Sequence, residues 1–300
     1  MDKSKSVGYR RLVAADRHEA FTVFRNSVFD YARQIGFIGP EVPNDIETAW
    51  LRQGALATHL EETVAEDWLA TRDDEIVGWA RSVLRGEHLQ LTHFFVDPEI
   101  QGQGVGRGLL DRAFPPHLGQ HRSILATQNP LALGLYLRFG VQPWGQTFEI
   151  GGTPAEREPA ADVKLERSDL TAEITEIDRE ALGFDRRIDL EFLAVDRPLY
   201  LATSNGQTVG YGFGSNGTAM GPAASVDPEF LPGILAGLDT EAATAGIEQV
   251  RYTLPGPAAP AIRWALDNGH RIEPFYEVLL ADTPRIRLDR YLMTQPGFIW

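Results

Sequence analysis

The spacing of apolar residues changes along the first half of the chain, and each change predicts a different element. Residues 16–37 place apolar side chains at helical spacing, which predicts an amphipathic helix. Residues 67–73 and 75–84 are rich in β-formers on either side of an Asp-Asp turn, which predicts a hairpin. Residues 89–96, LQLTHFFV, form an apolar run long enough to predict a central strand.

The elements that follow alternate between helix and strand. Residues 106–114, GRGLLDRAF, predict a helix with its leucines on one side. Residues 123–127 predict a buried strand, residues 131–140 a helix that a glycine ends, and residues 147–150 a last strand. The predicted fold class is therefore α/β, with a mixed, mostly antiparallel sheet flanked by helices.

The second half of the chain repeats the first. WLATRDDEIVG matches YLATSNGQTVG, the tetrapeptide VDPE occurs twice, and LYLRFG matches WALDNG in the same order. The matched positions are Trp68 and Tyr200, Val96 and Val226, and Gly140 and Gly269, at offsets of 132, 130 and 129 residues. We expect two copies of one fold: a first domain at residues 1–150, a linker at 151–162 rich in Gly, Pro and charge, and a second domain at 163–300.

Composition narrows the classes of protein. The chain has no cysteine, which excludes disulfides, thiolate zinc sites and a cysteine nucleophile. No stretch reaches the roughly 18 apolar residues of a membrane span, and the N-terminus has no apolar targeting segment, so we expect a cytoplasmic protein without membrane contact. The net charge of −14 disfavours nucleic acid as a partner and mildly favours amines.

The informative motif is FFVDPEIQGQGVGRGLL. A strand ends at Val96, Pro98 prevents its continuation, and glycine-rich residues 101–106 lead into a helix. Successive amides at such a helix start form a cradle for an anion, and a diphosphate fits it without a lysine. The loop comes late in the domain and lacks the lysine of a P-loop, which argues against the common dinucleotide and P-loop folds.

With this motif, the sequence resembles the GNAT superfamily of acyl-CoA-dependent N-acyltransferases. Gln101, Gly104 and Gly106 fill that family's Gln/Arg-x-x-Gly-x-Gly/Ala loop, after a strand that ends in Val-x-Pro. NPLALGLYLRFG supplies the family's Asn, at Asn129, and its helical Tyr, at Tyr136, although the closing Gly-Phe is here Gly-Val. The resemblance covers roughly residues 8–150 and implies two tandem GNAT-fold domains, given the internal repeat.

The resemblance also implies roles. Acetyl-CoA would lie between strands 89–96 and 123–127, where the amide of Phe94 would polarise the thioester carbonyl and Tyr136 would protonate the departing thiolate. The amide of Val96 and the side chain of Asn129 would hold the pantetheine arm. The residues expected to contact the cofactor are Phe94, Phe95, Val96, Gln101, Gly102, Gln103, Gly104, Val105, Gly106, Arg107, Asn129 and Tyr136.

The general base stays open at this point. In this family it often projects from the central strand, at positions that correspond here to Gln90 and Thr92, and neither takes a proton at neutral pH. His93 is one residue out of phase, so strand alternation predicts it on the opposite face as a packed core histidine. His88 shares the phase of Gln90 and is an alternative, as are a water relay and an amine that arrives neutral.

Two further features complete the candidate chemistry. His117 and His121 stand four residues apart, but the segment is proline-led and broken by glycine, so we predict no metal site. The chain ends in the apolar residues FIW, and some tandem members of the superfamily place a C-terminal carboxylate in the catalytic cleft. Trp300 is therefore a second candidate base, and packing of the tail at the domain interface is the alternative.

The second copy has lost the loop chemistry. Pro232 removes a backbone donor, and Ile234 brings a β-branched side chain to the position of a loop glycine. Residues 183–187 and 220–225 resemble the diverged C-terminal domain of certain two-domain acetyltransferases. We expect this domain to bind no cofactor and to act as a scaffold, a wall of the substrate cleft or an acceptor-recognition surface.

The predicted function is transfer of an acetyl group from acetyl-CoA to a primary amine of a small molecule or peptide, by direct attack in a ternary complex. The alternatives are an acyl-CoA-binding sensor without catalysis and a transferase of a longer acyl group. The protein would work as a monomer or homodimer and need no metal.

Overall fold

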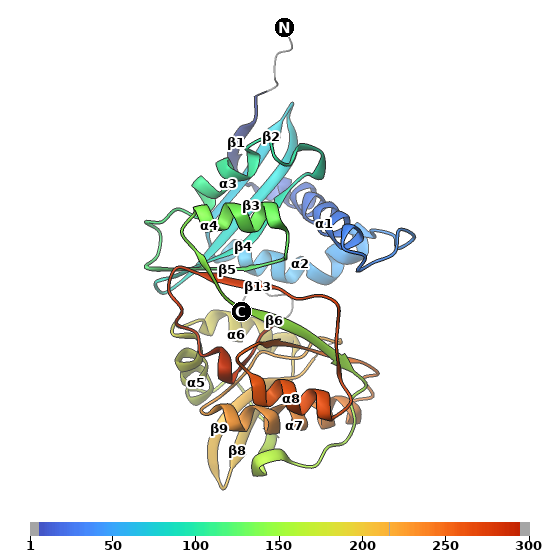
Figure 1. Cartoon of the computed structure of the whole chain (residues 1–300). Helices are drawn as coiled ribbons and strands as arrows, with labels where there is room; N and C mark the ends of the chain where they lie inside the picture. Colours follow the sequence, from blue (N-terminus) through green and yellow to red (C-terminus); the bar gives the residue numbers. More distant parts are fainter. Residues whose placement is uncertain (1–5, 216, 295–300) are drawn as a thin grey trace. The chain divides into compact units, whose positions relative to one another are not determined.

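The chain forms two compact units, residues 1–142 (unit 1) and residues 143–300 (unit 2), shown in the computed structural model of Figure 1. The structure describes residues 6–215 and 217–294. Each unit builds its core from β-strands covered by α-helices. The predicted α/β class with two tandem domains is confirmed.

The sheet of unit 1 carries the central strand that the sequence predicts. Its five strands follow the order β1-β2-β3-β4-β5, in which β1 to β4 pair antiparallel and β5 pairs parallel to β4. The bounds are β1 Gly8–Arg11, β2 Val64–Arg72, β3 Glu75–Arg85, β4 His88–Val96 and β5 His121–Ala126.

Helices cover both faces of this sheet (Figure 1). On one face, Phe24 of α1 stacks on Phe95 of β4, with ring centroids 4.7 Å apart. On the other face, α3 lies so close to β3 that a Cβ at Gly78 would come within 2.9 Å of Leu109. The bounds are α1 Arg17–Gln34, α2 Ile46–Glu62, α3 Val105–Ala113 and α4 Pro130–Arg138, with short 3₁₀ helices η1 Ala14–Asp16 and η2 Pro98–Ile100.

Unit 2 contains two sheets. One has β6 Gln142–Gly152 between β13 Val278–Ala281 and β11 Val250–Pro255, and β12 Arg271–Ile272 also pairs with β6. The other follows the order β14-β10-β9-β8-β7. Its strands are β7 Lys164–Arg167, β8 Leu199–Ser204, β9 Gln207–Phe213, β10 Ala223–Ser225 and β14 Tyr291–Leu292. The helices are α5 Ala172–Leu182, α6 Arg187–Asp196, α7 Leu231–Thr244 and α8 Ala259–Asp267, with η3 Ala160–Asp162, η4 Pro228–Phe230 and η5 Leu288–Arg290.

The boundary between the two compact units falls between residues 142 and 143 of the chain, whereas the sequence predicts it near residue 150. Strand β6 accounts for the difference, because Thr147 to Gly152 pair antiparallel with β11 of unit 2. Part of the predicted linker is also ordered against unit 2, since Arg157 Nε donates to Asp239 Oδ2 at 2.8 Å. The strand predicted at 147–150 therefore exists and belongs to the second unit.

The internal repeat is visible in local detail. Both predicted hairpins form, and both turns use two residues with positive φ, as the tight turns of twisted hairpins require. These residues are Asp73, Asp74, Asn205 and Gly206, with φ of 54°, 66°, 50° and 76°. The first strand of each hairpin shifts register at the same place, between Ala70 and Thr71 and between Ala202 and Thr203.

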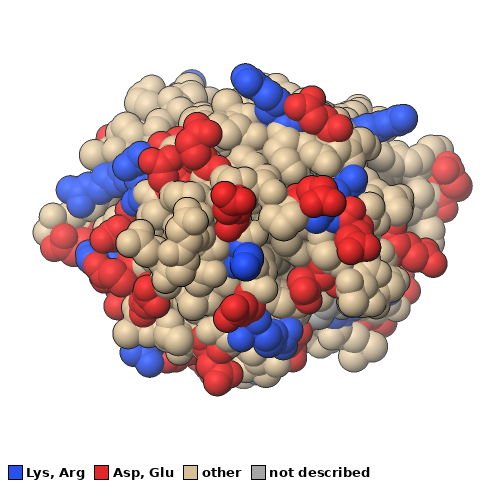
Figure 2. Space-filling view, turned by 90° about the horizontal axis from the view of Figure 1, so that it is seen from below, with Lys and Arg blue, Asp and Glu red and all other residues tan. Residues whose placement is uncertain are grey.

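Charge and helix length agree with the compositional picture. In the view of Figure 2, acidic side chains are spread among basic ones, and basic residues form no continuous patch on that face. Among the described residues, every helix is too short or too polar to cross a membrane.

Candidate active site

The glycine-rich loop of unit 1 follows a capped turn at the end of β4. Asp97 Oδ1 accepts a hydrogen bond from the Glu99 amide at 2.9 Å, and Pro98 starts the 3₁₀ turn η2. The chain then runs through exposed residues 101–104 into α3. Gly102 and Gly104 have φ of +80° and +86°, which side chains other than glycine rarely adopt.

The start of α3 is open to a ligand. No side chain caps the helix, and a Cβ at Gly102 or Gly104 would meet nothing within 4 Å. The first amides of a helix have no acceptor within the helix, and the helix dipole favours an anion beside them. Gly106 is required for a different reason, because a Cβ there would lie 2.9 Å from Phe94 Cζ. The loop therefore leaves its backbone and the helix start accessible, and phosphate binding there stays a prediction.

Strands β4 and β5 separate beside this loop. Their parallel register ends at Leu91 and Ile124, although β4 continues to Val96. The Asp97 amide donates to the Val77 carbonyl of β3 at 3.0 Å. Because amides alternate sides along a strand, those of Val96 and Phe94 point away from β3, toward the side of β5. The last residues of β4 are thus not paired with β5, at the place where the resemblance leads us to expect the thioester.

Tyr136 lies on α4, and Asn129 precedes that helix as its N-cap. The Tyr136 ring is buried and meets the Phe94 ring edge-on, with centroids 5.5 Å apart. Burial raises the pKa of the Tyr136 phenol, so it stays protonated at neutral pH. Asn129 is the N-cap of α4, and its Oδ1 accepts from the amides of Leu131 and Ala132 at 2.9 and 3.2 Å. This cap uses only the amide oxygen of Asn129 and leaves its NH₂ group for other partners.

Two side chains hold the end of β4 in a way that the sequence alone does not reveal. Gln101 Nε2 and Ser27 Oγ both donate to the Val96 carbonyl, at 3.0 and 3.2 Å. The Gln101 side chain therefore ties the loop back to the strand, and its contact with the cofactor stays a prediction. Of the remaining predicted contacts, Phe95 is half-buried, Val105 is buried, and Gln103 and Arg107 are exposed.

A β-bulge overturns the alternation argument for His93. Leu91 pairs with Ser82 and His93 pairs with Arg81, so Thr92 is an extra residue in β4. His93 consequently lies on the same face of the sheet as Gln90, and the prediction that it lies on the opposite face is wrong. The side chain is nevertheless a packed core histidine, with 4% of its surface exposed and its ring 4.2 Å from Trp79.

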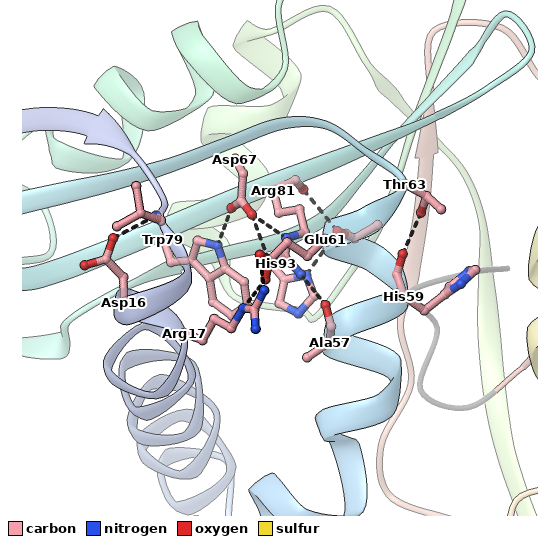
Figure 3. A network of polar contacts seen from close by, with 12 residues as sticks. Asp16, Arg17, Ala57, His59, Glu61, Thr63, Asp67, Trp79, Arg81 and His93 are labelled. Atoms are coloured by element: carbon pink, nitrogen blue, oxygen red, sulfur yellow. Dashed lines mark hydrogen bonds and ion pairs between the residues drawn. The ribbon is translucent and has the colours of Figure 1, made fainter.

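His93 belongs to a buried polar network (Figure 3). Asp67 accepts hydrogen bonds from Trp79 Nε1 at 2.7 Å and from Arg81 Nε at 2.8 Å. The pKa of His93 lies well below its usual range because the ring is buried and because Arg81 is close. Thr92 Oγ1 lies 3.0 Å from His93 Nδ1 and donates to the Arg81 carbonyl at 3.2 Å. This network explains a neutral histidine without assigning it any chemistry.

The remaining candidate bases are also buried. Gln90 and Thr92 have 3% and 7% of their surface exposed. His88 Nε2 lies 2.7 Å from Ser123 Oγ, in the part of β4 that pairs with β5. His88 precedes Phe94 by six residues, on the order of 20 Å along a strand, which is too far for direct proton transfer to an amine held at Phe94.

The other candidates lie outside this arrangement. His117 is exposed on the segment before β5, and His121 is the first residue of that strand. Among residues 6–215 and 217–294, no three His, Cys, Asp or Glu side chains gather as metal ligands would. Trp300 lies outside the described residues.

Unit 2 fills the matching positions with packed side chains. Helix α7 begins at Leu231, directly after the turn η4. Ile234, which aligns with Gly104, is completely buried, and a Cβ at Gly210 would come within 2.5 Å of it. Gly233 packs against Ala160 and Val163 so closely that a Cβ there would lie 2.3 Å from the Ala160 carbonyl.

Comparisons with known proteins agree with this geometry. Residues 65–143, which contain the hairpin, β4, the glycine loop and α4, match the family model of the acetyltransferase (GNAT) domain. This chain contains a GNAT acetyltransferase domain. It is 33% identical over 100 residues to the peptidyl-lysine N-acetyltransferase YjaB of Salmonella typhimurium, an alignment that covers 31% of this chain and 66% of that relative. The chain thus spans about two thirds of the length of that curated relative.

Solved structures extend the likeness to both units of this GNAT-domain protein. A putative acetyltransferase from Pyrococcus horikoshii superimposes with a TM-score of 0.69 at 17% identity, over 95% of this chain and 92% of that one. A tandem GNAT protein from the clavulanic acid biosynthesis pathway superimposes with a TM-score of 0.55 at 14% identity, over 93% and 99%. At such identities the likeness shows the fold alone, and both units of the chain are included in it.

Proposed function

We propose that unit 1 transfers an acetyl group from acetyl-CoA to a primary amine of a small molecule or peptide. The amine would attack directly in a ternary complex, without a covalent enzyme intermediate. The GNAT acetyltransferase domain supports acyl transfer, and the single observation that carries the proposal is the open, uncapped start of α3 beside the unpaired edge of β4.

The residues of unit 1 fit acetyl-CoA. The amides of residues 102–107 would receive the pyrophosphate at the positive end of α3, with Arg107 exposed beside them. The NH₂ group of Asn129 and the amide of Val96 are donors suited to the amide groups of a pantetheine arm. When bound, acetyl-CoA supplies an acetyl group activated as a thioester.

Unit 1 also provides donors for the charges that acyl transfer develops. The Phe94 amide points along the open edge of β4 and can donate to a carbonyl oxygen, and such a fixed donor is typically worth about 3 kcal/mol in the transition state. Tyr136 keeps its proton because burial raises the pKa of the phenol, so it can donate a hydrogen bond to a departing thiolate. Both groups adjoin the Phe94 ring.

No described side chain near Phe94 is an evident general base for the proposed transfer. Gln90 and Thr92 cannot take a proton, and His88 is distant from Phe94. A water relay, an amine that arrives neutral and the C-terminal carboxylate remain as explanations for deprotonation. The same observation favours a second candidate function, an acyl-CoA-binding sensor. Thiol release from acetyl-CoA over a panel of amines tests both, because binding of acetyl-CoA without turnover of any amine would exclude catalysis. Parallel assays with longer acyl-CoA thioesters test the acyl length.

The C-terminal carboxylate of Trp300 stays a hypothesis for the base. Deleting the last three residues should lower kcat strongly with little change in the affinity for acetyl-CoA, if that carboxylate takes the proton. A deletion that alters neither turnover nor thermal stability would exclude both the catalytic and the packing role of the tail.

A further inference from the structure

We propose that the α1–α2 region of unit 1 contains a subsite for an anionic group, a carboxylate or a phosphate, on the acceptor amine, with Arg25 as the recognising side chain. This inference rests on the proposed transfer to amines and specifies which amines are preferred.

Arg25 is a half-buried cation for which the described residues provide no hydrogen bond or ion pair. Its Nε has almost no contact with solvent, and no described residue accepts a hydrogen bond from it. The guanidinium lies over the Phe29 ring, 4.5 Å from the centroid. Burial lowers the pKa of Arg25, and the charge of Asp45 opposes this only in part. A buried guanidinium nitrogen without a hydrogen-bond partner is costly, so it calls for an explanation beyond packing.

Two other arginines of α1 do have hydrogen-bond partners within the protein. Arg33 lies over the same Phe29 ring, 5.8 Å from its centroid, and donates to the Val42 carbonyl at 2.8 Å. Arg17, also on α1, makes two hydrogen bonds to Glu61 at 2.6 Å. Asp45, the carboxylate that acts on Arg25, uses its side chain to cap α2 through the Thr48 amide. Arg25 therefore retains donors that suit a planar oxyanion.

The position of Arg25 connects it to the reaction site. The preceding residue, Phe24, contacts Phe95 of β4, and Ser27 donates to the Val96 carbonyl. Helix α1 thus borders the end of β4 along which the Phe94 and Val96 amides point. An acceptor whose anionic group binds Arg25 on this helix would present its amine toward that edge.

A second buried polar atom lies in the same region. Within residues 6–215 and 217–294, Asn44 Oδ1 has no hydrogen-bond partner, while Asn44 Nδ2 donates at 3.0 Å to Asn26, the residue that follows Arg25. The region therefore offers one unsatisfied donor and one unsatisfied acceptor. Such a pair suits a ligand that carries an oxyanion together with N–H groups.

The test compares acceptors that differ by one anionic group. L-Phenylalanine and 2-phenylethylamine differ by a carboxylate, and glucosamine 6-phosphate and glucosamine differ by a phosphate. In Arg25→Gln, the KM of the anionic member of the preferred pair should rise about tenfold to a hundredfold, as loss of a charged hydrogen bond implies. The KM values of the neutral member and of acetyl-CoA should stay within about twofold.

Arg33→Gln is the matched control, because it removes the same charge beside the same ring on the same helix. Arg33→Gln should leave the preference for the anionic acceptor unchanged. Arg25→Lys should keep part of the preference that Arg25→Gln loses. The inference is overturned if the unaltered protein prefers neither anionic acceptor. It is also overturned if Arg25→Gln and Arg33→Gln weaken the preference for the anionic acceptor equally.

Two measurements do not depend on turnover. Inorganic phosphate or acetate should show ligand-observed NMR broadening with the unaltered protein and with Arg33→Gln, and less with Arg25→Gln. The thermal midpoint of Arg25→Gln should equal or exceed that of the unaltered protein, because an unpartnered charge is removed. A marked loss of stability would make Arg25 structural and overturn the subsite. Anion binding that depends on Arg25, without acetylation of any amine, would instead reject the proposed transfer and retain the subsite.

Discussion

The two VDPE turns begin in the same way and continue differently. Asp227 Oδ1 accepts from the Glu229 amide at 3.0 Å, just as Asp97 does from Glu99 in unit 1. After the turn, unit 1 passes through an exposed loop with two glycines at positive φ before α3 starts, and neither α3 nor α7 has a side-chain cap. Unit 2 enters α7 at once and buries Leu231 and Ile234. The same turn thus precedes an open loop in one unit and an ordinary core helix in the other.

The strand edges differ in the same direction. In unit 1, the register of β4 with β5 ends at Leu91, which leaves the last residues of β4 open on that side. In unit 2, β14 pairs with β10 through Leu292 and Ala223, and Arg290 donates to the Val226 carbonyl. Segment 288–294 therefore lies along the edge that would correspond to the open one. Both changes favour cofactor binding in unit 1 alone, which stays a prediction.

The largest expected effects come from a feature that the units share, a buried arginine paired with a carboxylate. Arg81 pairs with Asp67, and Arg186 pairs with Asp178 at 2.7 Å, with both guanidinium groups about 2% exposed. Arg81→Met or Arg186→Met should lower the free energy of unfolding by about 3–5 kcal/mol, because each leaves a buried carboxylate unpaired. Urea denaturation measures this. Adding Asp67→Leu to Arg81→Met should recover part of the loss, and no recovery would contradict the explanation.

A second prediction tests the core role of α7. Ile234→Ala should lower the free energy of unfolding by about 2–5 kcal/mol, since the side chain is fully buried against Gly210 and Gly212. Affinity for acetyl-CoA, measured by calorimetry, should not change. A cost below about 1 kcal/mol would show that this position is not core, and a loss of affinity would place cofactor contacts in unit 2.

A third prediction places the residue of unit 2 in unit 1. Gly104→Ile should weaken acetyl-CoA binding about a hundredfold, because isoleucine at φ +86° is strained and its side chain enters the cradle. Gly104→Ile should lower the unfolding free energy less than Ile234→Ala does, because a Cβ at residue 104 meets open space. Gly246→Ile is the control, with φ +73° and open space but no relation to the loop. Retained affinity in Gly104→Ile would reject the site.

Sequence patterns predicted what depends on local chemistry. The hairpins followed from β-rich runs around turn residues, and the loop from glycines after Pro98. Three features could not be predicted from the sequence because they depend on packing between residues that are distant in the chain. The bulge at Thr92 turns His93 to the face of Gln90, and β6 pairs with β11 of unit 2. Arg25 Nε has no hydrogen-bond partner among the described residues, although its sequence neighbours are ordinary. Period-two alternation fails wherever one extra residue enters a strand.

The smallest expected effect is a pH dependence of the unfolding free energy that comes from unit 2. Burial, with the nearby charge of Glu149, raises the pKa of Glu277 in unit 2 to about 8. The folded state then favours the protonated carboxyl, so its contribution to stability is fully present below the unfolded pKa and is lost as pH rises towards 8. The unfolding free energy should fall by about 1 kcal/mol between pH 7 and 8 and level off above pH 8. Glu277→Gln should flatten that fall, whereas Glu87→Gln, an exposed carboxyl of unit 1, should leave it unchanged. A fall of equal slope in both variants would assign the alkaline loss to other groups.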